Sequence, residues 1–281
     1  MILKSRSRRK TADLVVKLLS TLAALVGLVI LGWILLVLLR RGSAAINWAF
    51  FTQLPAPPGG EGGGLGSAIV GTLAMTALST LLAVPLGLLA GIYLAEYGSD
   101  TRFGHLVRFT ANVMMGIPSI IIGLFVYTFL VVPFGHFSGY AGAVALGLLI
   151  LPVVARTTED MLGLVPNAFR ESALALGAPR WRVTVGVVMR AARAGVMTGV
   201  LLAVARVSGE TAPLLFTALN SPYWPTSLSR PTANLTVTIF NYAMSPYENW
   251  QQAAWGASLL IMAGILVMTL VTRFLIREKT R

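Results

Sequence analysis

Long stretches without a charged side chain are the feature that most limits how this chain can fold. Residues 109–155 form a run of 47 residues that contains no Asp, Glu, Lys or Arg, and residues 18–39 and 65–95 are also free of them. A helix needs about 20 apolar residues to cross the hydrocarbon layer, where only intrahelical hydrogen bonds satisfy the backbone. With a mean hydropathy of +0.78 and 11% charged residues, the sequence excludes an ordinary soluble domain.

These stretches predict an all-α integral membrane protein with six transmembrane helices. The turn-forming residues from Pro133 to Gly139 divide the longest stretch into two helices. The helices are expected at about residues 13–40, 65–96, 108–132, 139–160, 193–218 and 252–275. Residues 1–12 are expected to form a basic tail, 41–64 an outer Pro- and Gly-rich linker, 65–275 the core with a loop at 161–192, and 276–281 a second tail.

The basic residues predict how these helices are oriented. The chain has 22 Lys and Arg against 10 Asp and Glu, a formal net charge of +12. Of the 22, 18 lie before residue 18, between residues 95 and 109, between residues 155 and 194, or after residue 272, which are the segments on one side of the predicted helices. Because Lys and Arg remain on the cytoplasmic side of short loops, both termini and the 161–192 loop are predicted to be cytoplasmic. Since the cations lie between apolar stretches, no nucleic-acid partner is expected.

The residue inventory excludes several kinds of chemistry. The chain has no cysteine and two histidines, His105 and His136, which are 31 residues apart and form no metal-binding pattern. Its glycine-rich segment at 59–64 is not followed by Gly-Lys-Ser/Thr, so no nucleotide or other cofactor is expected in this chain. An integral membrane enzyme remains an alternative, with the adjacent Glu159 and Asp160 as its candidate carboxylates, although a solvated charge pair explains them as well.

Arg206 is the charged residue that most suggests a function. It lies 13 residues beyond Arg193 in the predicted fifth helix, which places it about 20 Å into a hydrocarbon core about 30 Å thick. Such a guanidinium faces a bundle interior or an aqueous path. Glu210 is four residues further on and is expected on the same helical face. Two explanations remain open: a solute pathway in which the guanidinium meets an oxyanion, or an ion pair that only holds helices together.

Two sequence blocks carry a resemblance to a known family. Glu171-Ser172-Ala173, with Gly177 four residues on, resembles the Glu-Ala-Ala-x-x-x-Gly loop of the permease subunits of binding-protein-dependent ABC importers. The resemblance implies that residues 166–180 form a coupling helix that docks on an ATPase subunit, with Glu171, Ser172, Ala173 and Gly177 at the contact. The chain departs from the family pattern at Arg190, where a proline is expected.

The second block narrows the resemblance to phosphate permeases of the PstA type. It consists of Gly116-Ile117-Pro118-Ser119, of Arg206 followed by Gly209-Glu210-Thr211-Ala212-Pro213, and of Thr238-Ile239-Phe240-Asn241-Tyr242. The similarity implies a type I ABC importer permease fold, with Arg206 and Glu210 in the substrate pathway. The motif residues Gly116, Pro118, Gly209 and Pro213 are expected at helix kinks.

The same resemblance implies a location and a set of partners. They are a bacterial inner membrane, a second permease of the PstC type, a dimer of PstB-type ATPase subunits that bind ATP and Mg, a PstS-type phosphate-binding protein, and inorganic phosphate itself. The chain is therefore expected to be a transporter subunit rather than an enzyme. An importer of the same build for another oxyanion or small solute is the alternative.

Overall fold

The computed structural model describes residues 2–60 and 62–278, and within them every regular element is helical. The long helices are α1 (Ile2–Gly42), α3 (Gly66–Glu96), α7 (Gly139–Gly163), α10 (Met189–Val207) and α13 (Glu248–Glu278). The shorter ones are α2 (Trp48–Thr52), α4 (Arg102–Gly116), α5 (Ser119–Val126), α6 (Val132–Phe134), α8 (Asn167–Ala175), α9 (Arg180–Val183), α11 (Ala212–Leu215) and α12 (Leu235–Ala243). Two π-helical turns, Tyr127–Val131 and Thr184–Val188, join α5 to α6 and α9 to α10.

Within residues 2–60 and 62–278, five helical segments are long and apolar enough to cross a membrane: Ala12–Ala45, Gly66–Glu96, Gly139–Gly163, Arg180–Val207 and Glu248–Val271. A sixth span results if Arg102–Gly116 and Ser119–Phe134 are counted together, although they are bent by 105° relative to each other. The predicted fold class of an all-α protein with several membrane spans is therefore confirmed.

The third predicted helix, 108–132, is wrong as a continuous element. Ile117 has extended backbone angles (φ −75°, ψ 130°), and Pro118 follows with ψ 135°. A proline disfavours the helical conformation in the residue before it, because its ring clashes with that residue's backbone and Cβ. Pro118 therefore separates α4 from α5, where a kink within one helix was expected.

Helices α3, α7 and α10 pack through small residues at the centre of the bundle. A Cβ atom on Gly91 of α3 would lie 2.5 Å from the Ala155 carbonyl oxygen of α7, and one on Gly87 would meet the Val154 side chain. On the other side of α7, Gly199 of α10 faces Thr157. The fully buried Met75, Ile150 and Val154 belong to the main apolar cluster between these helices. Close approach through glycine is the packing that membrane helices require.

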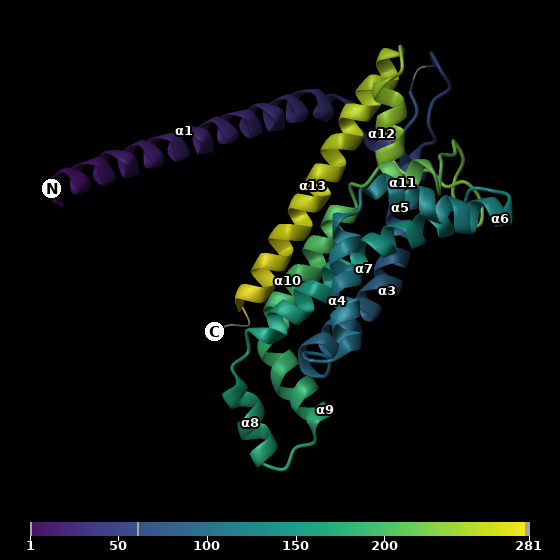
Figure 1. The fold of residues 1–281 in the computed structure, drawn as a ribbon. Coiled ribbons are helices and arrows are strands. Elements are labelled where there is room, and N and C mark those ends of the chain that lie inside the picture. The colour runs from purple at the N-terminus through teal and green to yellow at the C-terminus, as the bar shows by residue number, and fades with distance from the viewer. Residues whose placement is uncertain (1, 61, 279–281) are drawn as a thin grey trace.

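Helix α1 projects away from the bundle and meets it near its own end (Figure 1). Gly42 lies against Trp255 and Leu259 of α13, and the Arg41 guanidinium lies 5.3 Å from the centre of the Trp255 ring.

The expected tail at 1–12 is not a separate segment, because α1 already begins at Ile2. Lys and Arg are good helix formers, and no Gly or Pro interrupts them. At the other terminus α13 extends to Glu278, and residues 279–281 of the predicted tail lie outside the described part.

The predicted linker at 41–64 is more structured than expected. It contains α2, and its irregular part is tied to α13 by two hydrogen bonds: the Trp250 Nε1–H donates to the Ala56 carbonyl oxygen at 3.1 Å, and the Asn249 Nδ2–H to that of Gly60 at 2.6 Å. The Pro and Gly residues prevent regular structure, but backbone carbonyls that they leave unpaired within the segment bind side chains of α13.

Candidate translocation and coupling sites

Arg206 lies at the end of its helix, because α10 stops at Val207. The predicted helix at 193–218 is therefore too long. The Ser208 hydroxyl donates to the Val204 carbonyl oxygen at 2.8 Å, and the Gly209 backbone N–H donates to the Arg206 carbonyl oxygen. A new short helix, α11, begins at Ala212. Ser and Gly are weak helix formers that favour such ends.

Arg206 and Glu210 consequently do not share one helical face. Within the described residues no ion pair joins them, and the Arg206 side chain makes no hydrogen bond. The Arg206 side chain is exposed in this single subunit, whereas Glu210 is half-buried. The position is electrostatically suited to a cation, since the carbonyl ends of a helix carry a partial negative charge. The guanidinium is thus available to an external anion.

The two motif segments that contain Pro118 and Pro213 contact each other, although they lie far apart in the sequence. A Cβ on Gly123 of α5 would meet the backbone of Pro213 in α11. Gly116 is the last residue of α4, Gly209 lies in the break after α10, and Pro213 occupies the first turn of α11. Pro213 therefore starts a helix, which suits its missing N–H, and does not kink one as expected.

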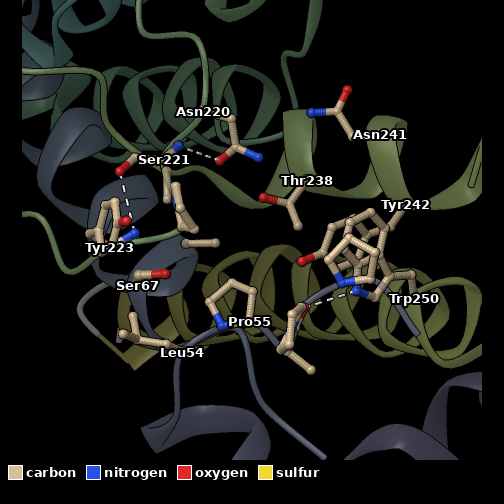
Figure 2. A pocket seen from close by; sticks show the side chains of 16 residues that line it. Leu54, Pro55, Ser67, Asn220, Ser221, Tyr223, Thr238, Asn241, Tyr242 and Trp250 are labelled. Carbon is tan, nitrogen blue, oxygen red and sulfur yellow. Dashed lines mark hydrogen bonds between the residues drawn. The ribbon is translucent and has the colours of Figure 1, made fainter. Parts of the chain in front are cut away.

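A pocket of about 490 Å³ opens at the end of the bundle that carries α12 and the linker (Figure 2). Its polar lining comes from neutral side chains, and no residue of its lining is charged. The Ser67 hydroxyl is buried without a hydrogen-bond partner, and Figure 2 shows it directed toward the same space as the hydroxyls of Thr238 and Tyr242. Burial raises the pKa of Tyr242, so its phenol stays protonated.

Helix α12 connects this pocket to the segment after α10. Its N-cap residue Asn234 accepts a hydrogen bond from the Val237 backbone N–H at 2.8 Å, which fixes the start of the helix. One turn of α12 contributes Thr238 and Tyr242 to the pocket, while Thr236 donates to the Glu210 carbonyl oxygen at 2.8 Å. The pocket wall and the Glu210 segment are therefore held by the same short helix.

The predicted coupling residues lie at the opposite end of the bundle, where α8 and α9 project from it (Figure 1). Glu171 and Ser172 are exposed and Ala173 is half-buried. Gly177 has a φ of +80°, a conformation that terminates helices and that glycine adopts without strain. Several large apolar side chains are exposed here, among them Phe169 (54% exposed), Leu176 (88%) and Trp181 (58%). Exposed apolar surface of this kind is typical of a contact with another protein or with a membrane.

Two arginine clusters that the sequence analysis missed secure this end. Glu159 accepts hydrogen bonds from Arg108 of α4 and Arg156 of α7, and its side chain is 12% exposed. Arg170 of α8 binds Glu96 at the end of α3, with 2.7 Å between Nη2 and Oε1. Arg108 is 51 residues from Glu159, and Arg170 is 74 residues from Glu96, so these two pairs leave no local sequence signal. The pair of Arg156 and Glu159, three residues apart on α7, does have one. The sequence signal that could have indicated these ion pairs is the position of Glu96 and Glu159 at the ends of predicted helices.

Glu159 is therefore not the solvated charge that the sequence suggested. Asp160 is such a solvated charge, because 59% of its side chain is exposed and its Oδ1 lies 3.7 Å from the Arg156 Nη2. Both carboxylate oxygens of Glu159 accept hydrogen bonds from guanidiniums, so its observed role is that of an ion-pair partner. Within the part of the chain that the structure describes, no cluster of three or more His, Asp or Glu residues is arranged to hold a metal ion.

Comparison with known proteins identifies the family. Residues 83–281 match the model of the binding-protein-dependent transport system inner membrane component family. The chain is 45% identical over 276 residues to the phosphate transport system permease protein PstA of Yersinia pestis, covering 98% of this chain and 94% of that protein. It is 47% identical over 272 residues to PstA of Haemophilus influenzae, with 96% of each chain covered.

Solved structures agree on the fold. An inward-facing MetNI methionine ABC transporter matches with a TM-score of 0.62 at 20% identity, covering 76% of this chain and 95% of that chain. A bacterial alginate ABC transporter in complex with its periplasmic protein matches with a TM-score of 0.65 at 17% identity, covering 90% and 91%. The two curated relatives are named as permease proteins of a phosphate transport system. The chain therefore belongs to the binding-protein-dependent transport system inner membrane components, in their PstA-type branch.

Proposed function

We propose that this chain is the transmembrane permease subunit of an ATP-driven phosphate importer of a bacterial inner membrane, where it forms half of the phosphate pathway. The observation that carries the proposal is its identity of 45–47% over nearly the full length to proteins named as phosphate transport permeases. The all-helical fold with five or six membrane spans supports it.

Arg206 is the residue of this chain that meets phosphate. Phosphate presents pairs of oxygens that match the fork of a guanidinium, which can bind them in bidentate fashion. The Arg206 side chain is exposed and carries no ion pair with any described residue, so binding an anion breaks no existing contact. Glu210 lies just beyond the end of α10. Its negative charge repels an anion bound at Arg206, which favours weak binding and release.

The loop from α8 to α9 couples the pathway to ATP hydrolysis in a partner. Its exposed Phe169, Leu176 and Trp181 supply apolar area for a docking contact, and Glu171 and Ser172 supply the polar rim. ATP and Mg bind in the ATPase subunits, a PstB-type dimer. A PstC-type permease provides the other half of the pathway, and a PstS-type protein delivers phosphate from outside.

The distribution of basic residues supports an orientation in which α8 and α9 lie in the cytoplasm. Arg108, Arg156 and Arg170 all lie at the α8 end of the bundle and are there engaged with carboxylates. The termini then lie on the cytoplasmic side, and the pocket of Figure 2 opens on the outer side, where phosphate arrives.

The test is import by the purified four-component complex in proteoliposomes. With phosphate-loaded binding protein outside and ATP inside, labelled phosphate should accumulate in the vesicles, and labelled sulfate delivered as the free ion should not. ATP hydrolysis should rise when loaded binding protein is added. Import of a different oxyanion in place of phosphate would contradict the substrate assignment and leave the importer architecture in place.

A further inference from the structure

Helix α8 does not hold its place on the bundle by apolar burial. None of the nine residues of Asn167–Ala175 is fully buried. Ala173 is the residue of α8 that contacts the apolar cluster around Val165 and Val183, and a single alanine contributes little area. A helix of this length is not stable alone, so a stronger contact must fix its position.

Arg170 provides that contact. Its Nη2 and Nε atoms lie 2.7 and 3.1 Å from Glu96 Oε1, and Nε lies 3.3 Å from Oε2. The same guanidinium donates from Nη1 to the Val165 carbonyl oxygen at 2.6 Å and from Nη2 to that of Leu162 at 2.9 Å. One side chain of α8 thus binds the end of α3 through a carboxylate and the end of α7 through two carbonyls.

The environment makes these bonds strong. The Arg170 and Glu96 side chains are 18% and 10% exposed, so water competes little. Charge-assisted hydrogen bonds in such surroundings are shorter and stronger than neutral ones. The Leu162 carbonyl belongs to the last turn of α7 and also accepts the Val165 backbone N–H at 3.2 Å, and the Val165 carbonyl lies two residues beyond the helix.

The two helix ends that Arg170 joins are also held together by close packing and by Arg108. Gly91 of α3 faces the backbone of Ala155 in α7. Arg108 adds hydrogen bonds to the carbonyl oxygens of Leu94 and Ser99, at 2.9 and 3.0 Å, and pairs with Glu159 of α7. A displacement of α8 can therefore reach α3 and α7 together through Arg170.

We propose that Arg170 is the positioning residue that links the coupling helix to the transmembrane core, by clamping α8 onto the joined ends of α3 and α7. This inference rests on the proposed coupling role of α8. Arg170 touches neither phosphate nor ATP. Its part is to convert movement of α8, driven by the ATPase partner, into movement of the two helices behind it.

The functional test compares phosphate imported per ATP hydrolysed in proteoliposomes that hold the full complex. Arg170→Gln should leave assembly intact and ATP hydrolysis within about twofold of wild type, while phosphate imported per ATP falls at least about fivefold. Arg170→Lys should give an intermediate ratio, since one ammonium retains the charge but cannot span a carboxylate and two carbonyls. The matched control is Arg193→Gln, because Arg193 is exposed, lies on α10 outside the coupling loop and has no ion pair among the described residues. An unchanged ratio in Arg170→Gln would overturn the proposal.

A distance measurement tests the clamp without the ATPase. The chain has no cysteine, so Ser99→Cys and Ala175→Cys give two clean spin-label positions, one beyond α3 and one on α8. In permease pairs in nanodiscs, the wild-type background and Arg193→Gln should show one narrow distance distribution, and Arg170→Gln a broad one. An equally narrow distribution in Arg170→Gln refutes the clamp. If wild-type complex imports no phosphate, the proposed function fails, and the label distances still decide whether Arg170 positions α8.

Discussion

Glu159 connects more charges than any other carboxylate among the described side chains. Both of its oxygens are used, one by Arg108 and one by Arg156, and its side chain is 12% exposed. Removing the Glu159 charge leaves the partly exposed Arg108 and Arg156 without their shared carboxylate, and such a loss costs more than the ion pairs themselves contribute. The adjacent Asp160 is a natural comparison, since it is 59% exposed and only loosely paired.

Glu159→Gln should therefore lower the free energy of unfolding by about 1–3 kcal/mol, a value reduced from that of fully buried pairs because the two arginines are 21% and 26% exposed. Thermal unfolding of the detergent-purified permease pair measures it. Asp160→Asn should change stability by less than about 0.5 kcal/mol. Equal melting temperatures for the two variants would show that Glu159 does not hold the helix ends together.

Residue patterns indicated Arg206 as the functional candidate in its helix, a role that stays a prediction, but they misjudged its surroundings. Arg206 and Glu210 are four residues apart, a spacing that implies a shared face only if the helix continues. Ser208 and Gly209 end α10 instead, and the apolar run from 212 to 218 concealed that end. The contacts of Glu96 with Arg170 and of Glu159 with Arg108 were not predictable, because these arginines come from other elements and are brought close only by packing.

At the scale of elements, the approach of α3 to α7 depends on glycines with no space for a side chain. A Cβ on Gly91 would lie 2.5 Å from both the Ala155 carbonyl oxygen and the Thr158 Cβ. Neither is the end of a flexible side chain, so the helices themselves must separate. Gly163, at the end of α7, has open space around its Cα.

Gly91→Ala should destabilise the permease by about 1–3 kcal/mol through overpacking, although alanine is the better helix former. Gly163→Ala should be neutral or stabilising. Thermal unfolding of both variants beside wild type is the measurement. A Gly91→Ala protein as stable as wild type would mean that α3 and α7 do not pack as closely as described.

Gly177 sets the end of α8 and hence the shape of the coupling loop. Its φ of +80° is a conformation that costs a residue with a Cβ about 1 kcal/mol or more. Gly177→Ala should therefore loosen the loop and weaken ATPase binding about fivefold, which titration of the permease pair in nanodiscs with purified ATPase subunits would detect. Gly186→Ala is the control, since Gly186 also has open space but no positive φ. Equal affinities for both variants would contradict this account of the loop.

The sequence predicted helices well where a long uncharged run lies between charged residues, as for α3 and α7. It failed where an apolar run contains a backbone break. Pro118 produces a 105° bend between α4 and α5, and a proline in an apolar run is equally compatible with a mild kink. The structure of the linker was not predictable either, because its hydrogen bonds to Asn249 and Trp250 join segments about 190 residues apart.

At the scale of the whole molecule, one end of the bundle carries α8 and the ion pairs of Glu96 and Glu159. The other end carries the neutral pocket and the break after α10. Arg206 stands at that break with an exposed guanidinium. This arrangement suits a subunit that receives an anion on one side and a mechanical signal on the other. The central claim is that the anion passes Arg206.

The most direct test is labelled-phosphate import by proteoliposomes that hold the assembled complex, with wild type, Arg206→Ala and Arg193→Ala side by side. Arg193 is exposed on the same helix and has no ion pair among the described residues. The account predicts that Arg206→Ala assembles, hydrolyses ATP and imports at least about tenfold less phosphate, while Arg193→Ala imports at the wild-type rate. Normal import by a fully assembled Arg206→Ala complex would contradict the claim that phosphate passes this residue.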